Sequence, residues 1–344
     1  MRSILRCIVR IIDGIPHCRP PARTRAFACA AAAILLNSLP AVRPADAAGP
    51  DRPGAQVVGA GWSATVTARH RRTIVPFRAS PFPYAGTVPA TGKPFYDIVL
   101  EDRSGRSSRR TGGIYWADKT YNDRRVLLDI PAGFDPARPG VIVVFFHGNA
   151  ATLDRDVVRR QRVPDQTAAA QLNSVLVAPQ MAHDAWDSSS GSFWKRGAFA
   201  AFMEEAATRL ARLAGDGTRA RTFRSMPIVL VAYSGGYQPL AFALRDPAIA
   251  PRVRGVVLLD ALYGELDAFE AWLARSRDGF LVSSFAKTTT ERNAQLQRAL
   301  EQIGRQPRAR TQAPSIRARS YLIPAPEAVS HHDFVTKACG PTCL

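Results

Sequence analysis

The feature of this 344-residue chain that most limits its fold is a series of short, largely apolar runs alternating with segments of helical periodicity. Val141–Phe146, Ser174–Ala178 and Pro227–Ala232 have almost no polar residues, so both faces of each strand are expected to be buried. Residues 154–171 and Gly197–Leu213 have apolar residues at helical spacing. The alternation predicts an α/β fold: a mostly parallel sheet with helices on both faces.

The strand-like runs predict a single domain from about residue 95 to residue 344. Eight strands are predicted in it, at Tyr96–Leu100, Arg125–Ile130, Val141–Phe146, Ser174–Ala178, Pro227–Ala232, Arg254–Asp260, Gly279–Phe285 and Ser320–Ile323. Residues 48–94, rich in Pro, Gly, Ala and Thr, predict a linker or a loosely attached arm.

The first 47 residues have the pattern of a cleavable secretion signal. Several arginines precede an Ala/Leu-rich stretch, Ala26–Leu39, and Ala45-Asp46-Ala47 fits a cleavage site that leaves Ala48 as the new N-terminus. A short buried N-terminal helix is the alternative. No apolar run reaches the roughly 18 residues of a membrane-spanning helix. We therefore expect a periplasmic or secreted protein that is not stably inserted in a membrane.

Removal of the leader leaves two cysteines, Cys339 and Cys343, in the sequence Cys-Gly-Pro-Thr-Cys. In an oxidising compartment a disulfide between them is possible, and two free thiols are the alternative. The remaining chain has 39 basic and 26 acidic residues, a net charge of about +13. The arginines of 69–72 and 103–110 lack interleaved aromatic residues, so they predict a solvated surface. No nucleic acid partner is expected, and weak binding to acidic envelope polymers or phospholipid headgroups is a secondary possibility.

One predicted strand leads into a motif that suits a nucleophilic serine. The run from Ile228 continues through Ala232-Tyr233-Ser234-Gly235-Gly236 into a predicted helix. A nucleophilic serine at the end of a strand needs a tight turn into a helix, with small residues two positions before and after it. The amide of Gly235, at the start of that helix, is expected to stabilise an oxyanion. An ordinary Ser-Gly-Gly loop is the alternative.

A second turn follows an earlier buried strand, at His147-Gly148-Asn149-Ala150. This is where the other oxyanion donor is expected, from the amide of Asn149 or Ala150. We expect His147 itself to tie the loop by hydrogen bonds and not to act as the base.

A serine nucleophile needs a nearby imidazole, and His331 and His332 follow the last predicted strand. We place His331 first and His332 second. Asp260 ends a buried strand on the edge where sheet-based sites form, so it is the candidate carboxylate that orients the imidazole. A helix N-cap is its alternative role. A metal site that joins the His-His-Asp sequence with residues 183 and 184 is a further alternative, which lacks the usual helical His spacing.

The chain order Ser234, Asp260, His331, with a His-Gly turn upstream, resembles the α/β-hydrolase superfamily. The resemblance covers most of residues 95–344, and Ile130–Asp135 is similar to its esterase and depolymerase branches. It implies acyl transfer to water through a serine ester, without a metal or an organic cofactor. Two features depart from the usual pattern. Ala232 replaces the usual first Gly, and the acid follows the strand next to the serine.

The stretch Pro179–Phe199 is unusual because it combines aromatic residues with several serines. It predicts a loop that lines the substrate site, and a packed surface loop is the alternative. The candidate lining residues are Trp186, Trp194, Tyr237 and Tyr263, with packing in the core or at the rim as the alternative role of the two tyrosines. The sequence thus predicts a serine hydrolase acting on a small-molecule or envelope ester, with amide or peptide bonds as the alternative substrate. A catalytically silent binding protein of the same fold is the rival from another class.

Overall fold

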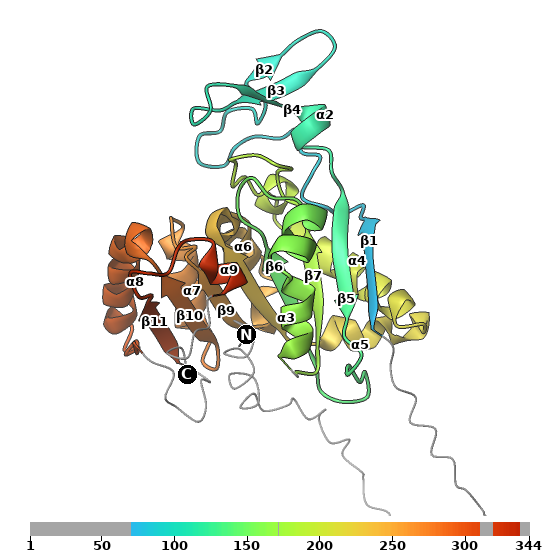
Figure 1. Ribbon diagram of the computed structural model, residues 1–344, viewed down its shortest axis with the longest axis vertical. Helices are drawn as coiled ribbons and strands as arrows, with labels where there is room; N and C mark the ends of the chain where they lie inside the picture. The colour runs from blue at the N-terminus through green and yellow to red at the C-terminus, as the bar shows by residue number, and fades with distance from the viewer. Residues whose placement is uncertain (1–69, 171, 310–318, 338–344) are drawn as a thin grey trace, which may run out of the picture. The chain divides into compact units, whose positions relative to one another are not determined.

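The computed structural model describes residues 70–170, 172–309 and 319–337, which belong to one compact unit. The predicted secretion signal and the pair Cys339 and Cys343 lie outside these residues. An eight-stranded sheet runs through the described part in the order β1-β5-β7-β6-β8-β9-β10-β11. β5 is antiparallel to both of its neighbours, β1 and β7, and the other seven strands of the sheet run in one direction (Figure 1).

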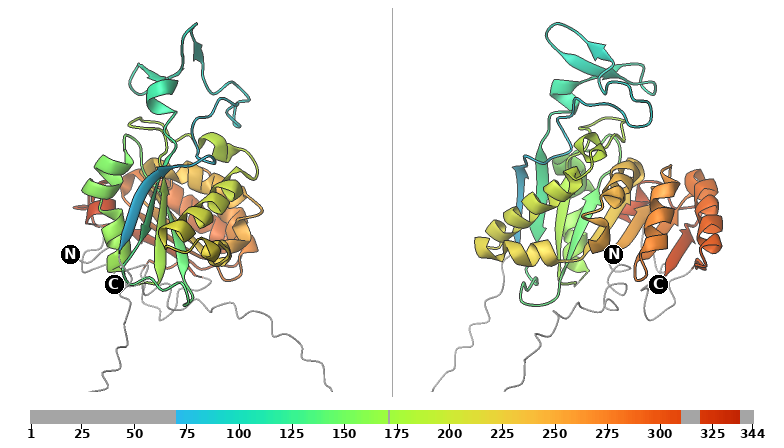
Figure 2. Two further views of the ribbon diagram at one scale, coloured as in Figure 1. Left: turned by 90° about the vertical axis from the view of Figure 1, so that its right-hand side faces the viewer. Right: turned by 180° about the vertical axis from the view of Figure 1, so that it is seen from behind.

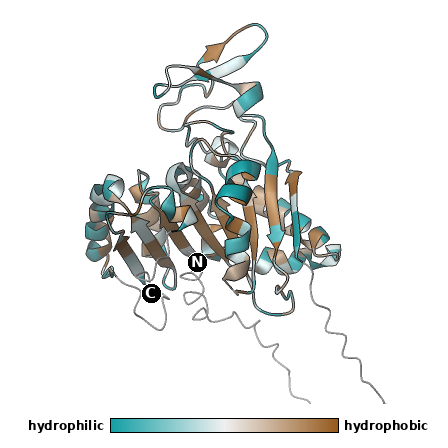
Figure 3. Ribbon diagram, viewed as in Figure 1, coloured by the Kyte–Doolittle hydropathy of each residue, from teal (hydrophilic) through white to brown (hydrophobic). Residues whose placement is uncertain are grey.

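The strands of the main sheet agree closely with the predicted ones from β5 onward. They are β1 (Arg71–Pro76), β5 (Arg125–Ile130), β6 (Val141–Phe146), β7 (Ser174–Pro179), β8 (Ile228–Tyr233), β9 (Val253–Leu259), β10 (Phe280–Phe285) and β11 (Ser320–Pro324). Every residue of β6, β7 and β8 is buried, as apolar runs covered on both faces require. The central strands of the sheet are accordingly largely hydrophobic (Figure 3).

Helices cover both faces of the sheet (Figure 2). The helices are η1, a π-helix (Leu153–Arg160), α3 (Val163–Ala169), α4 (Ala198–Leu213), α5 (Ala220–Ser225), α6 (Tyr237–Arg245), α7 (Leu266–Arg275), α8 (Thr290–Gln302) and α9 (Asp333–Thr336). Buried side chains of η1, α3 and α9 share one core cluster with the sheet, and those of α4 to α8 share the other. None of the described helices is both long enough and apolar enough to cross a bilayer.

The predicted helix 154–171 is interrupted in the structure. Arg162, between η1 and α3, adopts a left-handed conformation with φ of 52°. Pro164 follows two residues later. Since proline cannot donate a backbone hydrogen bond and restricts the residue before it, the chain restarts as a new helix there.

The boundary predicted at residue 95 is wrong, because β1 lies inside the segment assigned to an arm. β1 pairs with β5 along its whole length, from Arg71 opposite Ile130 to Pro76 opposite Arg125. The predicted strand Tyr96–Leu100 is instead β2 (Ile98–Val99) of a separate three-stranded sheet with β3 (Ser104–Ser107) and β4 (Ile114–Trp116). An edge strand that is only half buried has a weak apolar pattern, so its sequence resembles an arm.

Residues 77–124, which connect β1 to β5 and which we name the insertion, lie at the carboxyl edge of the parallel strands. Pro76 lies opposite Arg125, and Val126 lies opposite Pro179 at the end of β7, so the chain leaves and re-enters the sheet at that edge. The insertion holds the three-stranded sheet and the short helix α2 (Ala117–Thr120) (Figure 1).

Some arginines predicted to be solvated are bonded instead. Arg72 donates to the buried carboxylate of Asp129 at 2.7 Å and to Asp165 at 3.1 Å. Arg106 donates to the carbonyl of Phe95 at 3.0 Å. These partners are distant in sequence, so a local charge pattern does not reveal them.

Candidate active site

Ser234 lies on a sharp turn between strand β8 and a helical turn, η4 (Ser234–Gly236), that continues into α6. Its φ of 52° places it in the left-handed region, which few residues other than glycine adopt. Such a strained conformation persists only where the surrounding structure enforces it, and it is the conformation expected of a nucleophile at a strand-to-helix turn.

The small residues around Ser234 allow close packing. A Cβ on Gly236 would lie 2.3 Å from the carbonyl oxygen of Phe146, at the end of β6. A Cβ on Gly148 would lie 2.9 Å from the Cβ of Ser234. Both distances are too short for real carbon contacts, so this turn and the turn after β6 approach each other only because these residues are glycine.

Asp260 follows β9 at the same edge and is fully buried. Its Oδ2 lies 2.7 Å from Nδ1 of His331. Its Oδ1 accepts hydrogen bonds from the Thr289 hydroxyl at 2.6 Å and from the Ala286 amide at 3.1 Å. Burial by itself raises the pKa of this carboxyl, but the hydrogen bonds from His331, Thr289 and Ala286 outweigh it and hold the pKa of Asp260 below its usual value.

The structure distinguishes between the two candidate histidines. The ring of His331 stacks on that of Tyr233, the residue before Ser234, with centroids 4.9 Å apart. His331 contacts Asp260 and is about a third exposed, at 34%. The ring of His332 instead meets the His331 ring edge-on at 6.1 Å. With Nδ1 donating to the Asp260 carboxylate, Nε2 of His331 is the nitrogen left to accept a proton.

One of the two predicted oxyanion donors after β6 is already engaged. The amide of Ala150 donates to the carbonyl of Ala185 at 2.8 Å, so the expectation for Ala150 is corrected. Asn149 precedes it, and its Oδ1 accepts from the Ser188 hydroxyl at 3.1 Å. Gly235 lies in the first turn of a helix, where amides have no partner within the helix. The amides of Asn149 and Gly235 are therefore the candidate donors.

His147 ties the turn after β6, as expected from the sequence. Its Nδ1 lies 2.7 Å from the carbonyl oxygen of Gly148, and its Nε2 accepts from the Met181 amide at 2.9 Å and from the Gln180 side chain at 3.0 Å. Complete burial lowers the pKa of this imidazole, which keeps it neutral. A neutral ring with both nitrogens engaged holds the turn and is not available as a base.

The four predicted lining residues differ in their surroundings. Trp194 is half-buried and packs against the rings of Tyr84, at 5.4 Å, and Phe95, at 5.8 Å. Trp186 is exposed. Tyr237, in the first turn of the helix after Ser234, packs against the half-exposed Tyr263 with ring centroids 6.0 Å apart. All four residues remain candidates for lining the substrate site.

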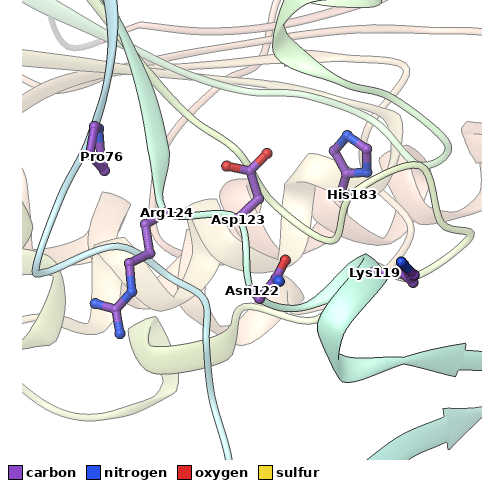
Figure 4. A pocket seen from close by; sticks show the side chains of 6 residues that line it. All are labelled: Pro76, Lys119, Asn122, Asp123, Arg124 and His183. Atoms are coloured by element: carbon purple, nitrogen blue, oxygen red, sulfur yellow. The ribbon is translucent and has the colours of Figure 1, made fainter.

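Within the described residues, no group of three or more His, Cys, Asp and Glu side chains is placed to hold a metal ion. His183 lies apart from His331, in a hollow of about 440 Å³ that is also lined by Lys119 and Asp123 (Figure 4). Asp123 is engaged by Arg125, whose guanidinium donates to it at 2.8 Å. The residues that line this hollow include an imidazole and a carboxylate but no serine.

The strand order of the sheet, with β5 antiparallel, is that of the α/β-hydrolase fold, and the site residues occur in the corresponding chain order: serine after β8, acid after β9, histidine after β11. The fold and the site therefore define a protein of α/β-hydrolase fold with the residue types of a serine hydrolase at the carboxyl edge of its sheet.

No protein-family model and no curated protein matches this chain. It is similar to the feruloyl esterase module from Clostridium thermocellum complexed with sinapinate, at 12% identity over 74% of this chain and 94% of the other, with a TM-score of 0.40. It is also similar to Thermogutta terrifontis esterase 2 phosphorylated by paraoxon, at 15% identity over 65% and 85%, with a TM-score of 0.40. An S-formylglutathione hydrolase from Agrobacterium tumefaciens is similar at 12% identity over 70% and 92%, with a TM-score of 0.38. The fold assignment comes from the strand order, not from these similarities.

Proposed function

We propose that the protein is a secreted serine hydrolase that cleaves carboxylic esters through a serine acyl-enzyme. The observation that carries the proposal is the 2.7 Å contact between Asp260 and His331, with the imidazole stacked beside the strained turn of Ser234. A buried carboxylate that orients an imidazole next to a serine is the arrangement that activates a hydroxyl for attack on an acyl carbon.

In the proposed reaction the Oγ of Ser234 attacks the ester carbonyl while Nε2 of His331 takes its proton. The carbonyl oxygen becomes an oxyanion, which the amides of Gly235 and Asn149 stabilise. The bond to the alcohol then breaks, and His331 gives its proton to the leaving oxygen. Water repeats the sequence on the acyl-enzyme, with His331 again as base, and releases the acid. Asp260 keeps the proton on Nδ1 and balances the imidazolium charge in both halves.

Labelling with a fluorophosphonate probe tests this proposal. We expect the wild-type protein to be labelled and Ser234→Ala to be unlabelled. Ser225→Ala, which alters an exposed serine at the end of α5, is the matched control and should be labelled like the wild type. An unlabelled wild-type protein contradicts the proposal and favours a catalytically silent binding protein. Labelling that survives Ser234→Ala contradicts the assignment of Ser234 as the nucleophile.

Secretion and an envelope or small-molecule ester substrate remain part of the proposal. The sequence of the leader supports secretion, because Ala45-Asp46-Ala47 fits the pattern of a cleavage site. N-terminal sequencing of exported protein should begin near Ala48, and an intact Met1 contradicts export by this signal. Parallel assays of an ester and of the amide with the same acyl group distinguish an esterase from an amidase.

A further inference from the structure

A polar hollow of about 590 Å³ lies between the insertion and the loop that follows β7. Its volume is within the range of sites for small molecules. Four cationic and two anionic side chains line it, together with Trp186: Lys93, Arg106, Arg109, Arg110, Asp97 and Asp187.

Contacts inside the protein engage the two carboxylates of this hollow. Asp187 accepts hydrogen bonds from the Tyr121 hydroxyl at 2.5 Å and from the Ser189 amide at 2.8 Å, and it pairs with Arg106 at 3.4 Å. Asp97 accepts from the amide of Ser107 at 2.7 Å and also from its hydroxyl. Arg106 is used as well, because it pairs with Asp187 and holds the backbone of the insertion.

The other three cations have no carboxylate partner among the described residues. Lys93, Arg109 and Arg110 are exposed, and none of the ion pairs found within residues 70–170, 172–309 and 319–337 includes them. The guanidinium of Arg110 lies over the ring of Trp186, 3.9 Å from the centroid. Stacking of this kind orients the guanidinium plane and leaves its N–H groups free to bind carboxylate or phosphate oxygens.

The loop that borders this hollow also borders the candidate active site. The Ser188 hydroxyl donates to Oδ1 of Asn149, one of the two oxyanion residues, at 3.1 Å. It lies 2.6 Å from the position that a Cβ on Gly235 would take. Trp186 is only two residues before Ser188, a span of at most about 7 Å along the chain. One short loop therefore contributes Trp186 and Asp187 to the hollow and Ser188 to the surroundings of Ser234.

We propose that this hollow binds an anionic group, a carboxylate or a phosphate, at the far end of the substrate that is cleaved at Ser234. The inference rests on the proposed function and adds a substrate class to it: esters in which the acyl or the alcohol part ends in an oxyacid anion. Lys93, Arg109 and Arg110 supply the charge, and the Trp186 ring orients one of the guanidinium groups.

The test compares straight-chain esters, in series of increasing length, whose acyl or alcohol chain ends in a methyl, a carboxylate or a phosphate. Hydrolysis is followed by proton release at constant pH. In either the acyl-chain or the alcohol-chain series, we expect kcat/KM for a charged ester to exceed that of its methyl-ended counterpart by about tenfold. This is the combined effect of three partly solvated charge pairs. The carboxylate and phosphate arms identify which anion is preferred.

The ratio of kcat/KM for the charged ester to kcat/KM for the methyl-ended ester should fall toward one in the triple variant Lys93→Gln/Arg109→Gln/Arg110→Gln. It should persist in a control that removes three exposed arginines elsewhere, Arg138→Gln/Arg221→Gln/Arg298→Gln. A wild-type ratio of one or less at every chain length, or a ratio that the first variant leaves unchanged, overturns the inference. Hydrolysis of the methyl-ended esters tests the proposed function separately.

Binding is also measured without turnover, in Ser234→Ala protein, from the change in tryptophan fluorescence during titration with suberate or octyl phosphate. We expect a saturable change that disappears when the three cations are replaced and when Trp186 is replaced by Phe. The absence of a saturable change, or an equal change after the cations are replaced, refutes the anion site whatever the fate of the esterase proposal.

Discussion

Asp260→Asn is the substitution that most directly tests the proposed chemistry. The carboxylate accepts three hydrogen bonds, from His331, Thr289 and the Ala286 amide. In the variant the amide oxygen can still accept from Thr289 and Ala286, but the amide nitrogen then faces Nδ1 of His331 as a donor. The imidazole must respond by moving its proton to Nε2, which can no longer accept a proton from Ser234.

The fold should tolerate this substitution, because Asn is nearly the same size and adopts positive φ readily, and φ at this position is 43°. We expect kcat to fall by about 10³- to 10⁴-fold, the loss seen when a serine triad holds the wrong tautomer. This corresponds to about 4 to 5.5 kcal/mol of transition-state stabilisation. KM should change little, because the aspartate acts on the imidazole and does not touch the substrate.

Steady-state hydrolysis of a short neutral ester measures this effect. Thr289→Val is the matched control, since it removes one hydrogen bond to Oδ1 and leaves the charge and the His331 contact in place. We expect that control to lose far less in kcat than Asp260→Asn, at most about 10- to 150-fold, because one hydrogen bond to a charged group contributes about 1.5–3 kcal/mol. If Asp260→Asn keeps kcat within tenfold of the wild type while circular dichroism shows a folded protein, the proposed tautomer control is refuted.

Three further predictions follow from the site. His331→Ala should lower kcat by at least about 10³-fold; we expect His332→Ala to stay within a few-fold of the wild type, and the reverse result would exchange their roles. Gly236→Ala places a Cβ 2.3 Å from the Phe146 carbonyl oxygen, so it should lower the free energy of unfolding in urea by about 1–3 kcal/mol or more, and an unchanged midpoint would contradict the packing described. Because its pKa is lowered in the folded protein, Asp260 contributes stability that is present above about pH 3.9 and lost as the pH falls through the folded value. The advantage of the wild type over Asp260→Asn in urea unfolding should therefore shrink between pH 6 and pH 3, and an advantage that grows on acidification would contradict this assignment.

The local sequence determined most of the main sheet and the residue types of the site. Runs such as Val141–Phe146 have only one stable environment, the interior of a sheet covered on both faces, so their ends agree with the structure within a residue or two. The turn at Ser234 was predictable for a similar reason, because a strand that enters a helix through small residues leaves few backbone conformations. These signals arise between neighbours in the chain.

Only the tertiary structure decided which side chains meet. The sequence ranks His331 before His332, but the contact that separates them is made with Asp260, which is 71 residues away. The Ala150 amide is engaged by Ala185, and Trp194 packs against rings of the insertion, through contacts that no local pattern encodes. The edge strand Arg71–Pro76 was missed because a half-buried strand with a long insertion after it is defined by its pairing with β5. Periodicity reports the burial of a segment, whereas the partner of each segment depends on the packing of the whole chain.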